Sequence, residues 1–122
     1  MTKSRKNIIG IIEVAQALFR NGTPKKAAQA LKCSQTFIYD MLSSQKDLVY
    51  LLVSGNKVKI GTTSNLVSRV KALRTSNPDA KIALVMNGNK STESALHARY
   101  AEYRLNGEWF SSNLVLTDLG AK

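Results

Sequence analysis

The hydrophobic pattern changes from helical to strand-like near residues 43–47, and this change most restricts how the chain can fold. Before it, apolar residues recur at three- and four-residue spacing; directly after it comes the uninterrupted run Leu48–Val53. A helical segment followed by a small sheet with its own helices is typical of the α+β class. With 122 residues, the chain is long enough for one ordinary domain or two very small ones. We therefore predict a helical unit over residues 1–46 and a sheet-containing unit over residues 47–122.

Three short helices are expected in the first unit. Apolar residues from Ile8 onward have helical spacing, and Gly22 is a residue that ends such a helix. Thr23 is a typical N-cap, and the proline that follows it is favoured in the first helical position. Ser34 is a second plausible N-cap, which starts a third helix after a tight turn.

The last two helices resemble the helix-turn-helix DNA-binding segments of bacteria and phages over about residues 23–44. The resemblance implies that the third helix reads the major groove and that the second helix meets phosphates. The implied groove residues are Ser34, Gln35, Thr36 and Tyr39, and the implied phosphate contacts are Lys25 and Lys26. Lys32 departs from the pattern, because glycine is usual at the turn. A plain three-helix packing unit with a solvated polar face is the alternative.

The charge balance points to a polyanionic partner. The chain has 18 Lys and Arg residues against 8 Asp and Glu residues, a net charge of +10, with +6 in the first unit and +4 in the second. Double-stranded DNA is the simplest such partner. One cysteine and one histidine exclude an internal disulfide and a multi-histidine metal cage. No apolar run approaches the ~18 residues of a membrane span, so we expect a protein of the bacterial cytoplasm without a membrane partner.

The second unit has the pattern of a small sheet flanked by helices. Its expected elements are strands at 48–53, 58–62 and 81–86, a helix at 65–74, and a long helix from Thr92 to about Leu105. Turn residues at 54–57 join the first two strands into a hairpin. The predicted order is therefore ββαβα, with a three-stranded sheet.

Several short motifs occur in the second unit in a fixed order. Leu48-Val49-Tyr50 and Lys59-Ile60-Gly61 lie on the two hairpin strands, Arg69 lies on the next helix, and Glu93 precedes His97 by four residues. Gly107-Glu108-Trp109-Phe110 follows. Over residues 48–110 this order resembles the GIY-YIG nuclease domain, and most of all its small phage-type subgroup. Both halves of the family's name motif are altered here, and only Tyr50 and Gly61 remain of its best-known residues.

The resemblance implies a catalytic set of Tyr50, Lys59, Arg69, Glu93 and His97. Glu93 would hold Mg²⁺ or Mn²⁺, and Arg69 would contact the phosphate. Tyr50 would be a general base or a phosphate contact, and the charge of Lys59 would lower the pKa of Tyr50 or of the attacking water. His97 would orient the carboxylate or shuttle a proton. Each residue also has an ordinary structural explanation, such as the favourable position of Glu93 near a helix start.

Three functions follow from these observations. The first is a small phage-type or mobile-element endonuclease that cuts DNA with a metal ion at a site selected partly by the helix-turn-helix. The second is a non-enzymatic, sequence-specific transcriptional repressor derived from a homing-type endonuclease and acting as a homodimer on two half-sites. The third is an RNA-binding accessory protein, which only the charge supports.

Overall fold

The structure is a computed structural model that describes residues 10–43 and 47–120. Ile8 of the first expected helix and the expected unit boundary at residue 46 lie outside these residues. The helices are α1 (Ile11–Asn21), α2 (Pro24–Leu31), α3 (Gln35–Ser43), α4 (Leu66–Ser76), α5 (Lys90–Arg99) and α6 (Ser112–Asp118), with a short 3₁₀ helix η2 (Ala101–Tyr103). The strands are β1 (Leu48–Ser54), β2 (Lys57–Thr63), β3 (Lys81–Asn87), β4 (Arg104–Asn106) and β5 (Trp109–Ser111).

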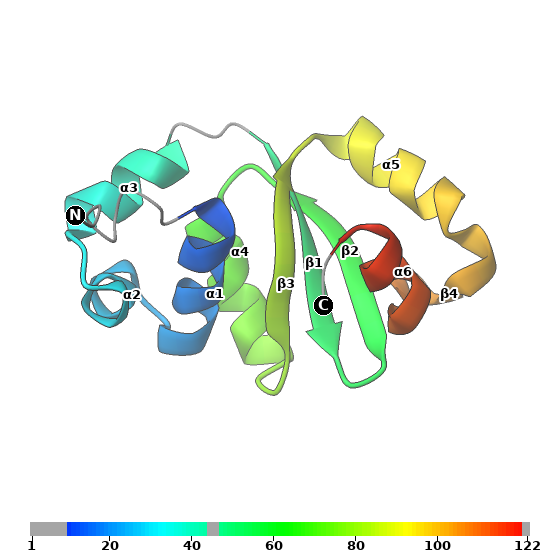
Figure 1. Cartoon of the computed structure of the whole chain (residues 1–122), viewed down its shortest axis with the longest axis horizontal. Helices are drawn as coiled ribbons and strands as arrows, with labels where there is room; N and C mark the ends of the chain where they lie inside the picture. The colour runs from blue at the N-terminus through cyan, green and yellow to red at the C-terminus, as the bar shows by residue number, and fades with distance from the viewer. Residues whose placement is uncertain (1–9, 44–46, 121–122) are drawn as a thin grey trace, which may run out of the picture.

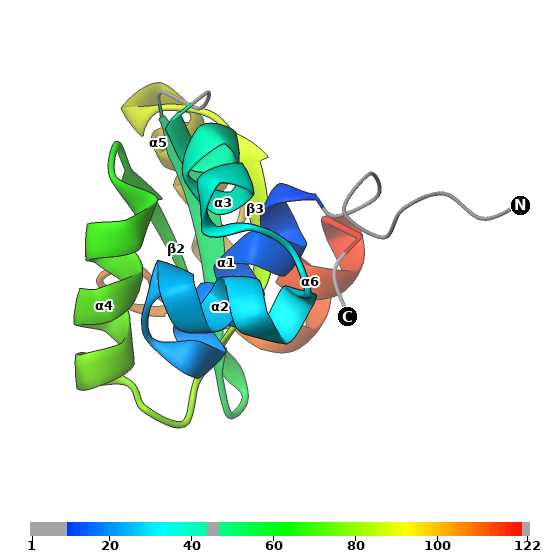
Figure 2. The ribbon, with the colours of Figure 1, turned by 90° about the vertical axis from the view of Figure 1, so that its left-hand side faces the viewer.

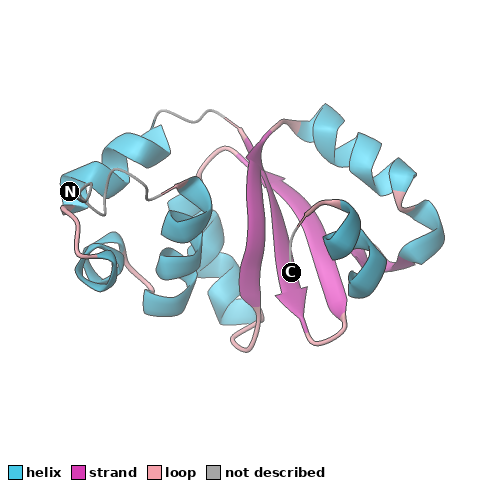
Figure 3. Ribbon diagram, in the orientation of Figure 1, coloured by secondary structure: helices cyan, strands magenta, loops and turns pink. Residues whose placement is uncertain are grey.

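One antiparallel sheet lies in the middle of the molecule, in the strand order β3-β1-β2-β5-β4. Helices α1 to α4 lie on one side of it, and α5 and α6 lie on the other, as Figure 1 shows. Figure 3 separates the central strands from the two helical layers by colour. The prediction of a mixed α+β fold is confirmed.

The prediction of a three-stranded sheet is wrong, because two further strands extend the sheet beyond β2. The long helix expected to reach Leu105 ends at Arg99. The chain turns there because Tyr100 is buried and its hydroxyl donates a 2.5 Å hydrogen bond to Asp118. Gly107 has φ +52, a left-handed conformation that favours glycine, and it lies in the turn between β4 and β5.

Local capping explains the ends of the N-terminal helices, which Figure 2 shows from outside the layer. The Thr23 side chain accepts a hydrogen bond from the Lys26 backbone at the start of α2. Ser34 Oγ accepts one from the Phe37 backbone N–H at 2.9 Å and starts α3. Lys32 adopts the left-handed conformation with φ 57 at the turn, where a glycine would meet less strain. These helices begin and end close to the positions that the sequence predicts.

The core consists of two clusters, one on each face of the sheet. Alternation along β1 places Tyr50 and Leu52 on the side of α1 and α4, and Val49 and Leu51 on the side of α5 and α6. Helix α1 contributes Val14 to the first cluster and contacts both β3 and α4. The N-terminal helices therefore share a core with the sheet. Across the two described ranges, no helix has the length and apolar character needed to span a membrane.

Tyr50 and Gly61 are direct partners across β1 and β2, and the Tyr50 side chain lies close against the glycine. A Cβ atom on Gly61 would lie 2.5 Å from Tyr50 Cζ, inside any normal contact distance. Because the Tyr50 ring is fully buried, it has little room to retreat. We expect Gly61→Ala to destabilise the fold by about 1–3 kcal/mol, measured by urea or thermal unfolding.

Gly10→Ala is the matched control, because a Cβ atom there meets nothing within 4 Å and the backbone φ is −100. Equal stability of the Gly61→Ala variant and the wild type would contradict the tight packing of Tyr50 on Gly61.

Candidate functional site

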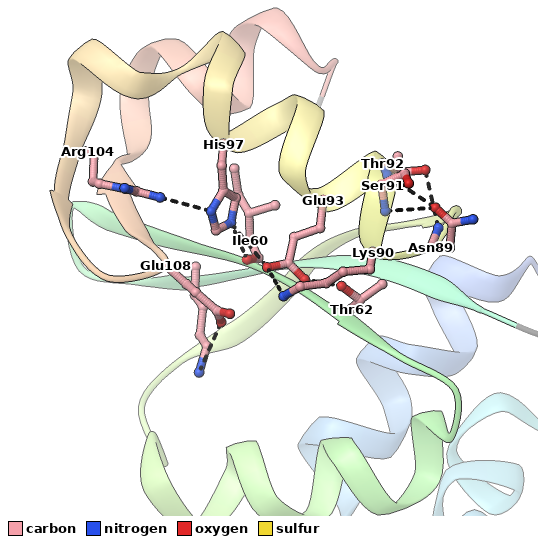
Figure 4. Close-up of polar contacts among 11 residues, drawn as sticks. Ile60, Thr62, Asn89, Lys90, Ser91, Thr92, Glu93, His97, Arg104 and Glu108 are labelled. Carbon is pink, nitrogen blue, oxygen red and sulfur yellow. Dashed lines mark hydrogen bonds and ion pairs between the residues drawn. The ribbon is translucent and has the colours of Figure 1, made fainter.

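A buried carboxylate lies at the centre of the candidate site. Glu93, in the first turn of α5, is only 3% exposed. The Thr62 hydroxyl donates a hydrogen bond to Glu93 Oε1, and Lys90 Nζ donates one to Oε2 at 3.1 Å. His97 Nε2 lies 3.5 Å from the same Oε2. Figure 4 shows these side chains converging from β2 and α5.

These partners keep Glu93 ionised. Burial raises the pKa of the Glu93 carboxyl, but hydrogen bonds from Thr62 and Lys90 and the positive charge of Lys90 outweigh it, so the pKa lies below its usual value. A buried charge without such partners would cost several kcal/mol. The site therefore presents a carboxylate, rather than a neutral acid, at neutral pH.

The start of α5 is fixed by a capping box. Asn89 Oδ1 accepts hydrogen bonds from the backbone N–H groups of Ser91 and Thr92, and Thr92 Oγ1 accepts one from the Asn89 N–H. The cap places Glu93 one turn into the helix, where the helix dipole also favours a negative charge.

His97 lies one turn after Glu93 and connects α5 to the edge of β2. Its Nε2 lies 3.0 Å from the Ile60 carbonyl oxygen, and its Nδ1 lies 3.1 Å from a terminal nitrogen of Arg104 on β4. The ring packs edge-on against Phe110, with 5.0 Å between centroids. Strand β5 pairs with β2 only at Lys57–Lys59, so the Ile60 carbonyl is a backbone acceptor just past that pairing.

Tyr50 lies on the face of the sheet that packs against α1 and α4, opposite to the face that α5 covers. Its ring lies over Gly61, and only 1% of the residue is exposed. Burial raises the pKa of the Tyr50 hydroxyl, the charge of Arg69 opposes this, and the carboxylates of Glu108 and Glu93 contribute to the rise, so that the pKa is about 12. The predicted lowering of the Tyr50 pKa is wrong, because burial raises it and Lys59 is not among the charges that act on it. Tyr50 is therefore protonated at neutral pH. An effect of Lys59 on the attacking water stays a prediction.

The two predicted basic residues occupy different positions. Arg69 is exposed on α4 and acts electrostatically on Tyr50, which places it near the hydroxyl. Lys59 is on β2, and its Nζ lies 3.9 Å from Glu108 Oε1. The charges of Arg69 on α4 and Glu93 on α5 both act on the Tyr50 hydroxyl, while Lys59 is paired with Glu108.

The residues predicted to contact DNA lie on the outer surface of the N-terminal layer. Lys25 and Lys26 are exposed on α2, and Gln35, Thr36 and Tyr39 are exposed on α3. Ser34 is exposed as well, but its hydroxyl caps α3. A groove of about 750 Å³ separates α3 from the start of α4, and Tyr39, Asn65 and Lys71 are among its lining residues.

Three residues of the site are absent from the set that the sequence predicts. Thr62 follows the Lys59-Ile60-Gly61 motif directly, and Lys90 lies three residues before Glu93 on the same helix face, so spacing could have identified both. Arg104 carries no such signal, because the pattern predicts a helix at its position. Its place in the site depends on the β4–β5 hairpin.

Glu93 is the residue that could hold a metal ion. Its oxygens are hard ligands of the kind that Mg²⁺ prefers, and one carboxylate with waters and substrate phosphates is a usual Mg²⁺ arrangement. Lys90 currently occupies one carboxylate oxygen, but its side chain is 75% exposed and free to swing outward. Within residues 10–43 and 47–120, no three His, Cys, Asp or Glu side chains form a ready-made metal cluster.

Comparison with known proteins gives one match. The T5orf172 domain matches residues 41–119, which covers the entire sheet and every residue around Glu93. No curated protein sequence and no solved structure matches the chain. Because the match spans more than half of the chain, the protein belongs to the T5orf172 domain family, a phage-associated family of nuclease-like domains.

Proposed function

We propose that this protein is a metal-dependent DNA endonuclease whose catalytic site is the cluster around Glu93. The observation that carries the proposal is a buried, ionised carboxylate whose charge, like that of the exposed Arg69, acts on the protonated hydroxyl of Tyr50. The residues match the order of the GIY-YIG motifs, and the family is nuclease-like. Buried charges of this kind are frequent at functional sites.

Each residue has a defined task in phosphodiester hydrolysis. Arg69 offers a planar guanidinium that neutralises charge on the phosphate as it passes through the transition state. Tyr50 is a hydrogen-bond donor rather than a base, because its hydroxyl keeps its proton at neutral pH. Thr62 holds Glu93 Oε1 in place. Glu93 would hold Mg²⁺ or Mn²⁺, which supplies charge neutralisation and stabilises the leaving oxygen.

The N-terminal helices supply site selection in this proposal. The exposed side chains of α3 would enter the major groove, while Lys25 and Lys26 would contact phosphates. The groove between α3 and the start of α4 connects this surface with the helix that carries Arg69. A DNA duplex read by α3 would thus have a path toward the catalytic cluster.

A second candidate function is that of a non-enzymatic, DNA-binding repressor. The Lys90–Glu93 ion pair favours it, since a domain retained for binding alone could keep Glu93 as the partner of a lysine. In this case DNA would be bound but not cut, and dimerisation would place two α3 helices on two half-sites.

Glu93→Gln tests the catalytic role of the carboxylate, because it keeps the size of the side chain and removes its charge. We expect Mg²⁺-dependent cleavage of phage and bacterial DNA fragments to fall by about two orders of magnitude or more, because a metal ion contributes several kcal/mol to the transition state. DNA affinity in a gel-shift assay should stay within a few-fold.

Glu102→Gln is the matched control, because Glu102 is an exposed carboxylate on η2 outside the cluster. Undiminished cleavage by the Glu93→Gln variant would remove the catalytic proposal. Retarded but intact DNA with the wild type, in Mg²⁺ and in Mn²⁺, would establish the repressor function instead.

Tyr50→Phe tests the role of the tyrosine. We expect cleavage to fall about 10- to 100-fold, since a hydrogen bond to a charged group is worth about 1.5–3 kcal/mol. With a pKa of about 12, the hydroxyl stays protonated between about pH 6 and 9, so wild type and variant should give pH–rate profiles of the same shape. A wild-type rate that rises about tenfold per pH unit, with no such rise in the variant, would identify Tyr50 as a base instead.

Replacement of Gln35 and Tyr39 by alanine tests the reading surface. We expect the preferred DNA site to relax, with discrimination reduced by about 1–3 kcal/mol for each base that these side chains read. Gln29→Ala is the control, because Gln29 is exposed on α2 rather than α3. Selection of bound sequences from a random library would measure the effect, and an unchanged preferred site would mean that another surface reads the DNA.

A further inference from the structure

Both nitrogens of the His97 imidazole lie within hydrogen-bonding distance of a polar group, one of which can only accept and the other only donate. Nε2 lies 3.0 Å from the Ile60 carbonyl oxygen, which can only accept a hydrogen bond. Nδ1 lies 3.1 Å from the Arg104 guanidinium, which can only donate. The first contact requires a proton on Nε2, and the second requires an unprotonated Nδ1, so together they specify one tautomer.

We infer that His97 is held as the neutral tautomer protonated at Nε2. Arg104 is the positioning residue that holds this tautomer, because it donates a hydrogen bond to Nδ1. Nε2–H donates to the Ile60 carbonyl, with Glu93 Oε2 3.5 Å from the same nitrogen. The lone pair of Nδ1 accepts from Arg104. A proton shuttle needs one nitrogen open to water or substrate, and neither nitrogen has that freedom here.

The surrounding packing fixes the ring in this orientation. The buried Phe110 lies edge-on to the imidazole, and the Arg104 guanidinium lies 5.6 Å from the centre of the same phenyl ring. Only 14% of the His97 side chain is exposed. A ring flip would place Cε1 against the Ile60 carbonyl and Cδ2 against the Arg104 guanidinium, so it would break both hydrogen bonds.

The consequence is that His97 ties α5 to β2 at the Ile60 carbonyl, one turn away from the carboxylate. This contact and the Thr62 hydrogen bond fix Glu93 from two sides, while Lys90 remains movable. His97 thus acts through Glu93 rather than on the substrate. This role rests on the proposed nuclease function, whereas the tautomer does not.

The tautomer can be measured without any cleavage assay. His97 is the only histidine in the sequence, so the two imidazole ¹⁵N resonances of the intact labelled protein belong to it alone. At about pH 8.5, two units above the ordinary histidine pKa, we expect a protonated Nε2 and an unprotonated Nδ1. A protonated Nδ1, or rapid averaging of the two tautomers, would overturn the inference.

Arg104→Met tests the partner of Nδ1. The Nδ1 resonance should move toward that of an unbonded nitrogen, while the Nε2–H signal should remain. Arg99→Met is the control, since Arg99 pairs with Asp118 and should leave both resonances in place. An Nδ1 resonance that is equally unaffected in the two variants would remove Arg104 from this role.

Two amide variants test the role in the reaction. Glutamine places its N–H close to the position of Nε2, whereas asparagine mimics Nδ1. We expect His97→Gln to keep cleavage within about tenfold of the wild type, and His97→Asn to reduce it about 100-fold or more, with both folds checked by thermal unfolding. An equal reduction in the two folded variants would support a proton shuttle and overturn the positioning role. If the wild type cuts no DNA, the proposed function fails, and the NMR result still decides the tautomer.

Discussion

The candidate site is built on the antiparallel register of β1 and β2. This register pairs Tyr50 with Gly61, so the tyrosine ring lies against a residue that has no side chain. A Cβ atom at position 61 would collide with the ring. The same register turns Thr62 to the opposite face, where it meets Glu93. A slip of one residue would exchange the two faces and separate both contacts.

The second requirement is compensation of the buried charge on Glu93. The Thr62 hydroxyl on β2 and the Lys90 ammonium on α5 donate hydrogen bonds to this carboxylate. His97 connects α5 to β2 through the Ile60 carbonyl. Such an arrangement combines a rigid side, formed by Thr62 and His97, with a movable side, formed by Lys90. A carboxylate fixed on one side and open on the other suits a proposed metal ligand better than one enclosed by immobile partners.

Predictions from the sequence succeeded where local periodicity and capping decide the structure. The mixed α+β class, the helices α2 and α3, and the first hairpin follow from apolar spacing, from Thr23 and Ser34 as caps, and from the turn before β2. The prediction was wrong at residues 100–111, where a 3₁₀ turn and two strands replace the end of the expected helix. Strands of three residues have too little pattern to be recognised. They form here because β5 pairs with β2 and β4 pairs with β5.

The amino-acid sequence specifies which elements form and in what order, because spacing, caps and turn residues act within a few positions of each other. It also assigns the candidate residues to the right elements, since the motif order is a property of the chain. The pKa direction of Tyr50, the pairing of Lys59 with Glu108, and the contact between Arg104 and His97 arise only in the folded chain. These depend on burial and on groups brought together across the sheet, which local sequence does not encode.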